Sequence, residues 1–301
     1  MKNKYKISKN EYFIKPYPHI IKDNFFDDRT LKNILYNWPD ENLFSNEIPG
    51  IKLLDLFHST QRTKHSFLEF FINLLKKKRR ISSESLDFWT NFLKFDIPKI
   101  NSELYKTFKF DLFSKFSIKK TPDISQLNLM QASNLFIEHH VHNHHYHNPN
   151  WTFTVLIYLD DNNLKTPGTD IYEPKYNHKE EYKEFLTKFS ITNPILSANS
   201  KKLLRSKTVE FKKNRLFAFL DSPISYHGVK KTNLSKNFKN GSRKILRLHC
   251  SYNEKTVNKI YGMDLKEYKK IRSGHPKKLL NNNNIIYKGV KFEIDNLLKN
   301  R

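Results

Sequence analysis

Histidines are crowded into one short stretch of this sequence. Residues 139–150 read HHVHNHHYHNPN, so six of the thirteen histidines in the chain fall within nine positions. Imidazole is the commonest protein ligand for metal ions. The stretch is therefore either a polar tract that captures metal adventitiously or an ordered metal site, and its surroundings must distinguish the two.

Two of these histidines have the spacing of ligands on a strand. His145 and His147 lie just before the run TFTVLIYL (152–159), which predicts a β-strand. Residues i and i+2 of an extended chain face the same side, so both imidazoles can converge on one ion. His227 follows another predicted strand, RLFAFL (215–220), and is a third candidate ligand.

A candidate anion-binding residue follows at a short distance along the chain. Arg243 begins the predicted strand RKILRLH, sixteen residues after His227. A guanidinium can bind a carboxylate through two parallel hydrogen bonds. Arg247 lies four residues further on, on the same face of that strand, and is the second candidate.

These motifs, in this order, resemble those of the iron(II)- and 2-oxoglutarate-dependent oxygenases, in particular the prolyl-hydroxylase-like branch. The resemblance rests on the stretches HYHNPNWTFTVLIYLDD, PGTDIY, FKKNRLFAFLDSPISYHGV and SRKILRLHCSYN. It extends over most of residues 12–253, and its specific part is 145–247. It implies a double-stranded β-helix, or jelly roll, whose open end holds the metal.

The resemblance also assigns roles to individual residues. It implies iron(II) held by His145, His147 and His227, with 2-oxoglutarate and O2 as co-substrates of a non-haem iron dioxygenase that hydroxylates its substrate. It implies that Arg243 binds the far carboxylate of 2-oxoglutarate, with Arg247 as the alternative. The remaining candidates are Tyr158, whose hydroxyl could reach the same carboxylate, and Thr169 and Asp170, which could line the mouth of the site on the substrate side.

The sequence departs from the family pattern at one ligand. The family has a His-x-Asp or His-x-Glu pair, whereas this chain has His-x-His, and no acidic residue lies between Glu138 and Asp160. Counting back from Tyr158 and Leu159 selects the pair at 145 and 147 over the pair at 140 and 142. His147 is then either the third ligand or a substrate-binding residue, with another group completing the metal sphere.

The predicted elements that must position these residues form an α+β protein. Residues 1–12 predict a loose arm, residues 12–21 an extended segment, and residues 27–35 a helix capped by Asp27 or Asp28. Helices are also predicted at 64–78 and 84–115, and short strands from residue 124. We expect an N-terminal first strand and helical layer (1–122), a jelly-roll metal-binding core (123–253) and a basic C-terminal extension (254–301).

Composition restricts the partners. A net charge of +24 favours an acidic or phosphorylated substrate, or nucleic acid, although the basic residues are spread along the chain. The single cysteine, Cys250, excludes an intramolecular disulfide. No run of about eighteen apolar residues could span a bilayer, and the N-terminus lacks the apolar core of a signal peptide. We therefore expect a cytoplasmic protein with no membrane partner.

Three functions remain open from the sequence. The first is a 2-oxoglutarate-dependent hydroxylase. The second is a jelly-roll protein whose three-histidine metal centre performs chemistry independent of 2-oxoglutarate. The third is a degenerate oxygenase fold that acts as a nucleic-acid-binding module. The sequence identifies neither the main substrate nor the oligomeric state.

Overall fold

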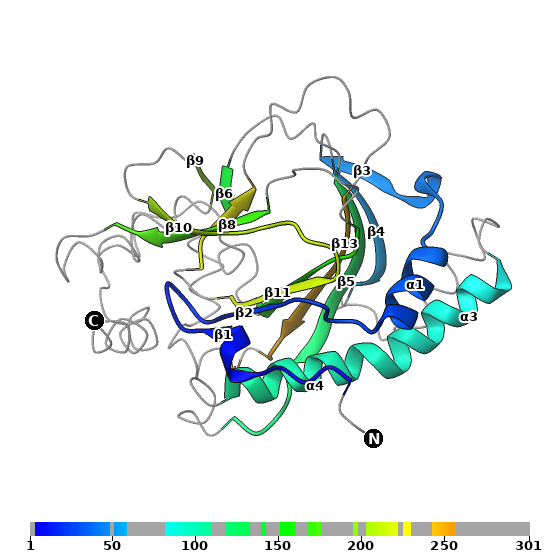
Figure 1. Cartoon of the computed structure of the whole chain (residues 1–301), viewed down its shortest axis with the longest axis horizontal. Coiled ribbons are helices and arrows are strands. Elements are labelled where there is room, and N and C mark those ends of the chain that lie inside the picture. Colours follow the sequence, from blue (N-terminus) through cyan, green and yellow to red (C-terminus); the bar gives the residue numbers. More distant parts are fainter. Residues whose placement is uncertain are drawn as a thin grey trace.

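Two antiparallel sheets and a group of helices make up the described part of the computed structural model (Figure 1). The structure describes residues 4–48, 51–58, 82–109, 118–132, 140–142, 151–160, 168–175, 195–197, 203–221, 225–229, 243–253 and 255–256. The mixture of helices and antiparallel strands confirms the predicted α+β class.

The helical elements that the structure describes lie between residues 9 and 108. They are η1 (Lys9–Glu11), α1 (Asp28–Tyr36), η2 (Glu41–Leu43), α3 (Ser83–Asn91), η3 (Phe92–Asp96) and α4 (Ile97–Phe108). The strands are β1 (Tyr12–Phe13), β2 (His19–Lys22), β3 (Ser45–Ile48), β4 (Ile51–His58), β5 (Asp123–Ala132), β6 (His140–His142), β7 (Trp151–Tyr158), β8 (Thr169–Pro174), β9 (Ile195–Ser197), β10 (Leu203–Val209), β11 (Arg215–Leu220), β12 (His227–Val229) and β13 (Arg243–Ser251).

The chain passes repeatedly between a large and a small sheet. The large sheet has the order β1-β2-β11-β7-β13-β5-β4-β3, and the small sheet has the order β10-β8-β12-β6-β9. From β5 onward the chain alternates between them: β5, β7, β11 and β13 belong to the large sheet, and the strands between them belong to the small one.

The two faces of the large sheet pack against different layers. Its outer face contributes alternate residues such as Val155, Ile157 and Leu246 to a core shared with α3, η3 and α4. Its inner face contributes Tyr158, Phe217 and others to a second core, shared with the small sheet. Successive side chains of a strand point to opposite faces of the sheet, so neighbouring residues belong to different cores. Figure 1 shows the helices and the small sheet on opposite sides of the large sheet.

Several predicted elements are confirmed at their expected places. Helix α1 begins after Asp27, whose carboxylate accepts a hydrogen bond from Thr30 N at 2.7 Å, as expected of a helix N-cap. The predicted strands TFTVLIYL, RLFAFL and RKILRLH are found as β7, β11 and β13. The predicted helix at 84–115 is divided into α3, η3 and α4, and the last of these ends at Phe108.

The prediction of a loose arm at residues 1–12 is wrong for the part of this segment that the structure describes. Tyr5 is fully buried, its hydroxyl donates to Asp96 Oδ1 at 2.5 Å, and its ring lies 5.4 Å from that of Phe25. The strands β3 and β4 were not predicted, and β4 pairs with β5 in the large sheet. The predicted helix at 64–78 and nearly all of residues 254–301 lie outside the described residues.

None of the helices that the structure describes combines the length and the apolar character needed to cross a membrane.

Asn214 joins the N-terminal segment to the start of β11. It has a positive φ of 60°, and its side chain accepts from Phe26 N at 2.9 Å and donates to Phe26 O at 2.8 Å. Its backbone N–H donates to Tyr158 O at 2.7 Å. Asparagine tolerates this left-handed conformation better than most residues. One residue therefore fixes the segment before α1 against the end of β7.

We predict that Asn214→Ala lowers the free energy of unfolding by about 2 to 3 kcal/mol, because it removes two buried hydrogen bonds and places a Cβ residue at positive φ. Asn214→Gly removes the same bonds but tolerates the backbone, so it should cost about 1 kcal/mol less. Chemical denaturation measures both. If the two variants lost equal amounts of unfolding free energy, the positive φ at residue 214 would contribute nothing to stability.

Candidate functional site

His227 opens β12, in the middle of the small sheet. It is 5% exposed, its ring centroid lies 4.6 Å from that of Phe219, and its Nδ1 lies 3.1 Å from Ser225 O. A carbonyl can only accept, so Nδ1 carries a proton, and in the neutral ring Nε2 carries the lone pair. This is the arrangement of a metal-binding histidine, whose other ring nitrogen donates to a neighbouring group. The donor chemistry of His227 therefore fits a metal ligand.

Tyr158 and Arg243 are buried together near one end of the inner face of the large sheet. The guanidinium carbon of Arg243 lies 5.8 Å from the ring centroid of Phe211, and the Tyr158 and Phe211 rings are 4.6 Å apart. The Tyr158 hydroxyl is 2.7 Å from Thr169 Oγ1. Burial lowers the pKa of Arg243, and the charge of Tyr158 opposes that shift. Burial raises the pKa of Tyr158 to about 12.

These two side chains suit a carboxylate. Arg243 stays charged and can donate two parallel hydrogen bonds, and the Tyr158 phenol stays protonated and can donate a third. Hydrogen bonds from a cation to an anion are stronger where water is excluded. The end of the interior that holds Tyr158 and Arg243 can therefore bind an anionic group.

The other residues predicted for the co-substrate and substrate are held by neighbours. Arg247 is partly buried, and its Nε donates to Asn128 Oδ1 at 2.8 Å. Asp170 is buried and accepts from Thr208 Oγ1 at 2.5 Å, with the Tyr172 hydroxyl at 3.5 Å. The bond to Thr208 ties β8 to β10. Thr169 is placed by its bond to Tyr158.

His145 and His147 lie outside the described residues. Among the residues that the structure does describe, no three His, Cys, Asp or Glu residues are grouped so that they could hold a metal ion. The backbone of β6 adds one observation, because His142 is registered with His227 across the β6–β12 pair. By strand register alone, His140 and His142 are also candidate metal ligands. Counting back from Tyr158 and Leu159 in the sequence had favoured His145 and His147 instead.

Three polar residues that the sequence reasoning missed lie on the inner face of the large sheet. Thr154 Oγ1 donates to Asp221 Oδ2 at 2.7 Å and lies 3.0 Å from His249 Nδ1. All three side chains are fully buried. The sequence held only a weak signal: each is a polar residue among the apolar residues of a predicted strand or at its end, in TFTVLIYL, RLFAFLD and RKILRLHC, and the last of these strands also carries Arg243, Lys244 and Arg247.

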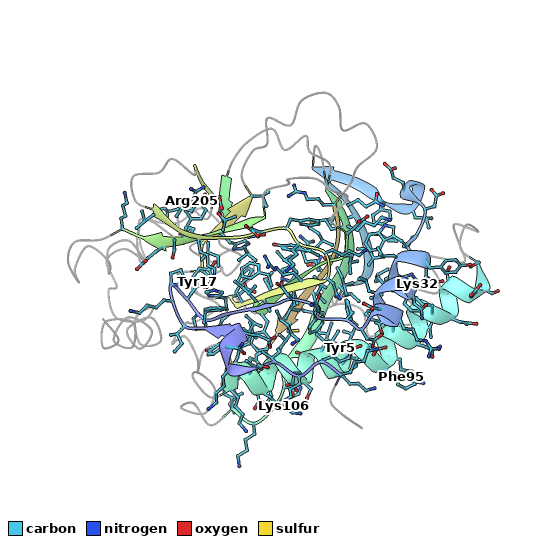
Figure 2. All side chains as sticks on the ribbon, viewed as in Figure 1. Tyr5, Tyr17, Lys32, Phe95, Lys106 and Arg205 are labelled. Atoms are coloured by element: carbon cyan, nitrogen blue, oxygen red, sulfur yellow. The ribbon has the colours of Figure 1, made fainter. Side chains whose placement is uncertain are left out.

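Asp221 is an expensive residue to bury. Desolvation raises the pKa of its carboxyl to about 7, although the hydrogen bond from Thr154 opposes the shift. Burial raises the pKa of nearby Tyr17, and the charge of Asp221 adds to that shift. Figure 2 shows Tyr17 between β2 and the small sheet, which carries Arg205. A perturbed carboxyl in such a place is typical of functional sites.

Comparisons with known proteins found similar solved structures but no match to the sequence. No protein family matches the sequence, and no curated protein matches it. Solved structures that resemble the chain include an oxidoreductase of the 2OG-Fe(II) oxygenase family from Burkholderia pseudomallei, at 10% identity, a TM-score of 0.39 and coverage of 77% of this chain and 84% of that one.

Two prolyl hydroxylases are also similar. The enzyme from Trichoplax adhaerens, in complex with a hypoxia inducible factor oxygen degradation domain peptide fragment, is 14% identical with a TM-score of 0.37, over 77% of this chain and 83% of that one. A prolyl 4-hydroxylase from Phytophthora capsici is 14% identical with a TM-score of 0.38, over 94% and 83%.

The raised pKa of Asp221 gives a prediction about stability. Its carboxyl ionises near pH 4 when unfolded but near 7 when folded, so its burial increasingly opposes folding as the pH rises from about 4 to about 7. Asp221→Asn keeps an acceptor for Thr154 and removes the charge. The variant should be more stable than the native protein above pH 7, by up to about 4 kcal/mol, and the difference should vanish below pH 4. Denaturation at several pH values measures this, and a difference independent of pH would contradict it.

Proposed function

We propose that this protein is an iron(II)- and 2-oxoglutarate-dependent oxygenase that hydroxylates its substrate. The observation that carries the proposal is the buried pair of Tyr158 and Arg243, a carboxylate-binding arrangement inside the same interior as His227. In the proposed enzyme, Arg243 and Tyr158 bind the far carboxylate of 2-oxoglutarate. His227 Nε2, His145 and His147 hold the iron.

The strand order supports a jelly-roll reading. The strands β11-β7-β13-β5 are consecutive neighbours in the large sheet, and β10-β8-β12-β6 are consecutive neighbours in the small sheet. The chain crosses between these two sets of four in the manner of a double-stranded β-helix. We propose that β5 to β8 and β10 to β13 are its eight strands, with β1 to β4 extending the large sheet.

The residues of this chain would contribute binding, orientation and exclusion of water. Iron(II) with 2-oxoglutarate would supply the oxidising chemistry. Arg243 lies at the start of β13 and would orient the co-substrate through its two parallel donors. His227 is held in one tautomer by Ser225 O and in one plane by Phe219, so its Nε2 needs no rearrangement to act as a ligand. The aromatic side chains around them keep the site dry.

The proposed ligand set is unusual in its charge. Three neutral imidazoles would leave an iron(II) centre at +2, whereas two imidazoles and one carboxylate would leave it at +1. Anionic 2-oxoglutarate would offset part of this difference. A site of this kind would therefore depend more strongly on the co-substrate for tight metal binding.

The first test is an anaerobic titration with iron(II) and 2-oxoglutarate, followed by the charge-transfer absorption of the complex. Arg243→Ala should weaken 2-oxoglutarate binding by about 10- to 100-fold, because a charge-assisted pair of hydrogen bonds is lost. Arg205→Ala, an exposed arginine on β10, is the matched control and should bind normally. Full iron binding with no 2-oxoglutarate binding in the native protein would instead favour a metal centre that works without the co-substrate.

The second test compares the two candidate histidine pairs. We expect His147→Ala to weaken iron(II) binding by at least about 10-fold and His142→Ala to leave it unchanged. His147→Asp should retain iron and alter the charge-transfer absorption, because one neutral ligand becomes an anion. The opposite result for the two alanine variants would move the ligand pair to residues 140 and 142, which the strand register of His142 with His227 would explain.

A further inference from the structure

The hydroxyl of Tyr17 reaches the backbone next to the candidate metal ligand. Tyr17 is fully buried just before β2, and its hydroxyl donates to Tyr226 O at 3.1 Å. The same carbonyl accepts from Tyr172 N, on β8, at 2.9 Å. Tyr17 lies between β2 and the small sheet (Figure 2). It therefore links the N-terminal segment, across the interior, to the peptide group that leads into His227.

This peptide group decides where the imidazole of His227 begins. A peptide unit is planar, so the carbonyl of Tyr226 and the Cα of His227 move together. His227 is the first residue of β12, and the pairing of β12 with β8 runs from His227 to Val229. The backbone just before the ligand is thus outside this ladder. Two donors to Tyr226 O hold it there, one from β8 and one from the segment before β2.

The ring of Tyr17 supports the same ligand by a second route. It meets the ring of Phe219 edge-on, with 6.0 Å between the ring centroids and an interplanar angle of 62°. The centroid of Phe219 lies in turn 4.6 Å from that of the His227 imidazole. Edge-on aromatic pairs favour particular relative orientations. Tyr17 therefore contacts both the backbone before the ligand and the ring that packs on the ligand.

The pairing of β2 with β11 holds Tyr17 in place. His19 Nδ1 donates to Tyr17 O at 2.8 Å, because a carbonyl can only accept. Leu220 N donates to Pro18 O at 3.0 Å, and His19 is registered with Phe219. The phenol is therefore carried by the large sheet, whereas the ligand beside it is carried by the small sheet.

Packing alone would not require the hydroxyl of Tyr17. A phenylalanine would keep the edge-on contact with Phe219, and Tyr226 O would keep its bond from Tyr172 N. Burial raises the pKa of Tyr17, and the charge of Asp221 adds to that shift, so the hydroxyl stays protonated and can donate. What the hydroxyl adds is a second donor, from the side of the large sheet, on the carbonyl next to the ligand.

We propose that Tyr17 is a positioning residue that fixes the direction of the His227 imidazole toward the metal. Its hydroxyl holds the peptide group before His227, and its ring holds Phe219 against the imidazole. The inference rests on the proposed oxygenase function, because it takes His227 as a metal ligand. Loss of groups that orient a ligand weakens metal binding by roughly 10- to 100-fold, so loss of the hydroxyl alone should cost about 10-fold.

Cobalt(II) is the probe of the ligand geometry, because its d–d absorption depends on the positions of the ligands. Tyr17→Phe should bind cobalt(II) about 10-fold more weakly than the native protein, with a shifted absorption spectrum. Tyr105→Phe is the matched control, because it also removes a buried phenol that donates to a backbone carbonyl, Ile118 O at 2.8 Å, but in the core shared with the helices. This control should keep native affinity and spectrum. Native behaviour of Tyr17→Phe, or equal changes in both variants, would overturn the inference.

Amide hydrogen exchange of the metal-free protein tests the positioning without the metal. The amide of Tyr172, which donates to Tyr226 O, and the amide of His227 should exchange about 10-fold faster in Tyr17→Phe than in Tyr105→Phe, because one local hydrogen bond is lost. Equal exchange at both amides would overturn the inference even in a protein that binds cobalt(II). Failure of the proposed function has a different outcome: the native protein would bind no cobalt(II), or His227→Ala would bind it as tightly, and the inference would fall with it.

Discussion

The antiparallel pairing of β7 with β13 decides which side chains enter the interior of this protein. In both strands every second residue faces the helices and the others face the small sheet. A shift of one residue in this register would turn one strand's inward side chains out of the interior: Tyr158 and Thr154 if β7 moved, or Arg243 and His249 if β13 moved. The register is held by apolar residues on the outer face, where Val155, Ile157, Leu246 and Leu248 are all buried. The outer core thus sets the chemistry of the inner one.

The interior contains groups that oppose folding. Desolvation lowers the pKa of Arg243 and raises the pKa values of Asp221 and Tyr158. Each of these shifts disfavours the charged form of the group. Burial of such groups is tolerated only where hydrogen bonds or charges compensate for lost water. The positive and negative groups are placed at different ends of the interior. A ligand that bridges those ends would meet a field that points from one end to the other.

Much of this arrangement could be predicted from the sequence, and the failures have physical reasons. Alternating or continuous apolar runs between turn residues predict β7, β11 and β13, and Asp27 marks the start of α1. The strand β4 was missed because a run such as IKLLDLFH has no decisive period, and its pairing with β5 is a long-range contact. Tyr5 was missed because a short polar segment gives no sign that one aromatic will be buried. Thr154, Asp221 and His249 were missed because only the folded register brings them together.

The position of β2 has a consequence for any shortened form of the protein. β2 pairs with β11 along Leu216 to Phe219, and the Tyr17 hydroxyl donates to Tyr226 O, immediately before His227. A chain that started at residue 123 would lose this strand and leave β11 as an open edge with Phe217 and Phe219 beside it. Exposed apolar edges recruit other chains. The first twenty or so residues are thus part of the wall around the candidate site, and removing them would favour aggregation over an isolated catalytic core.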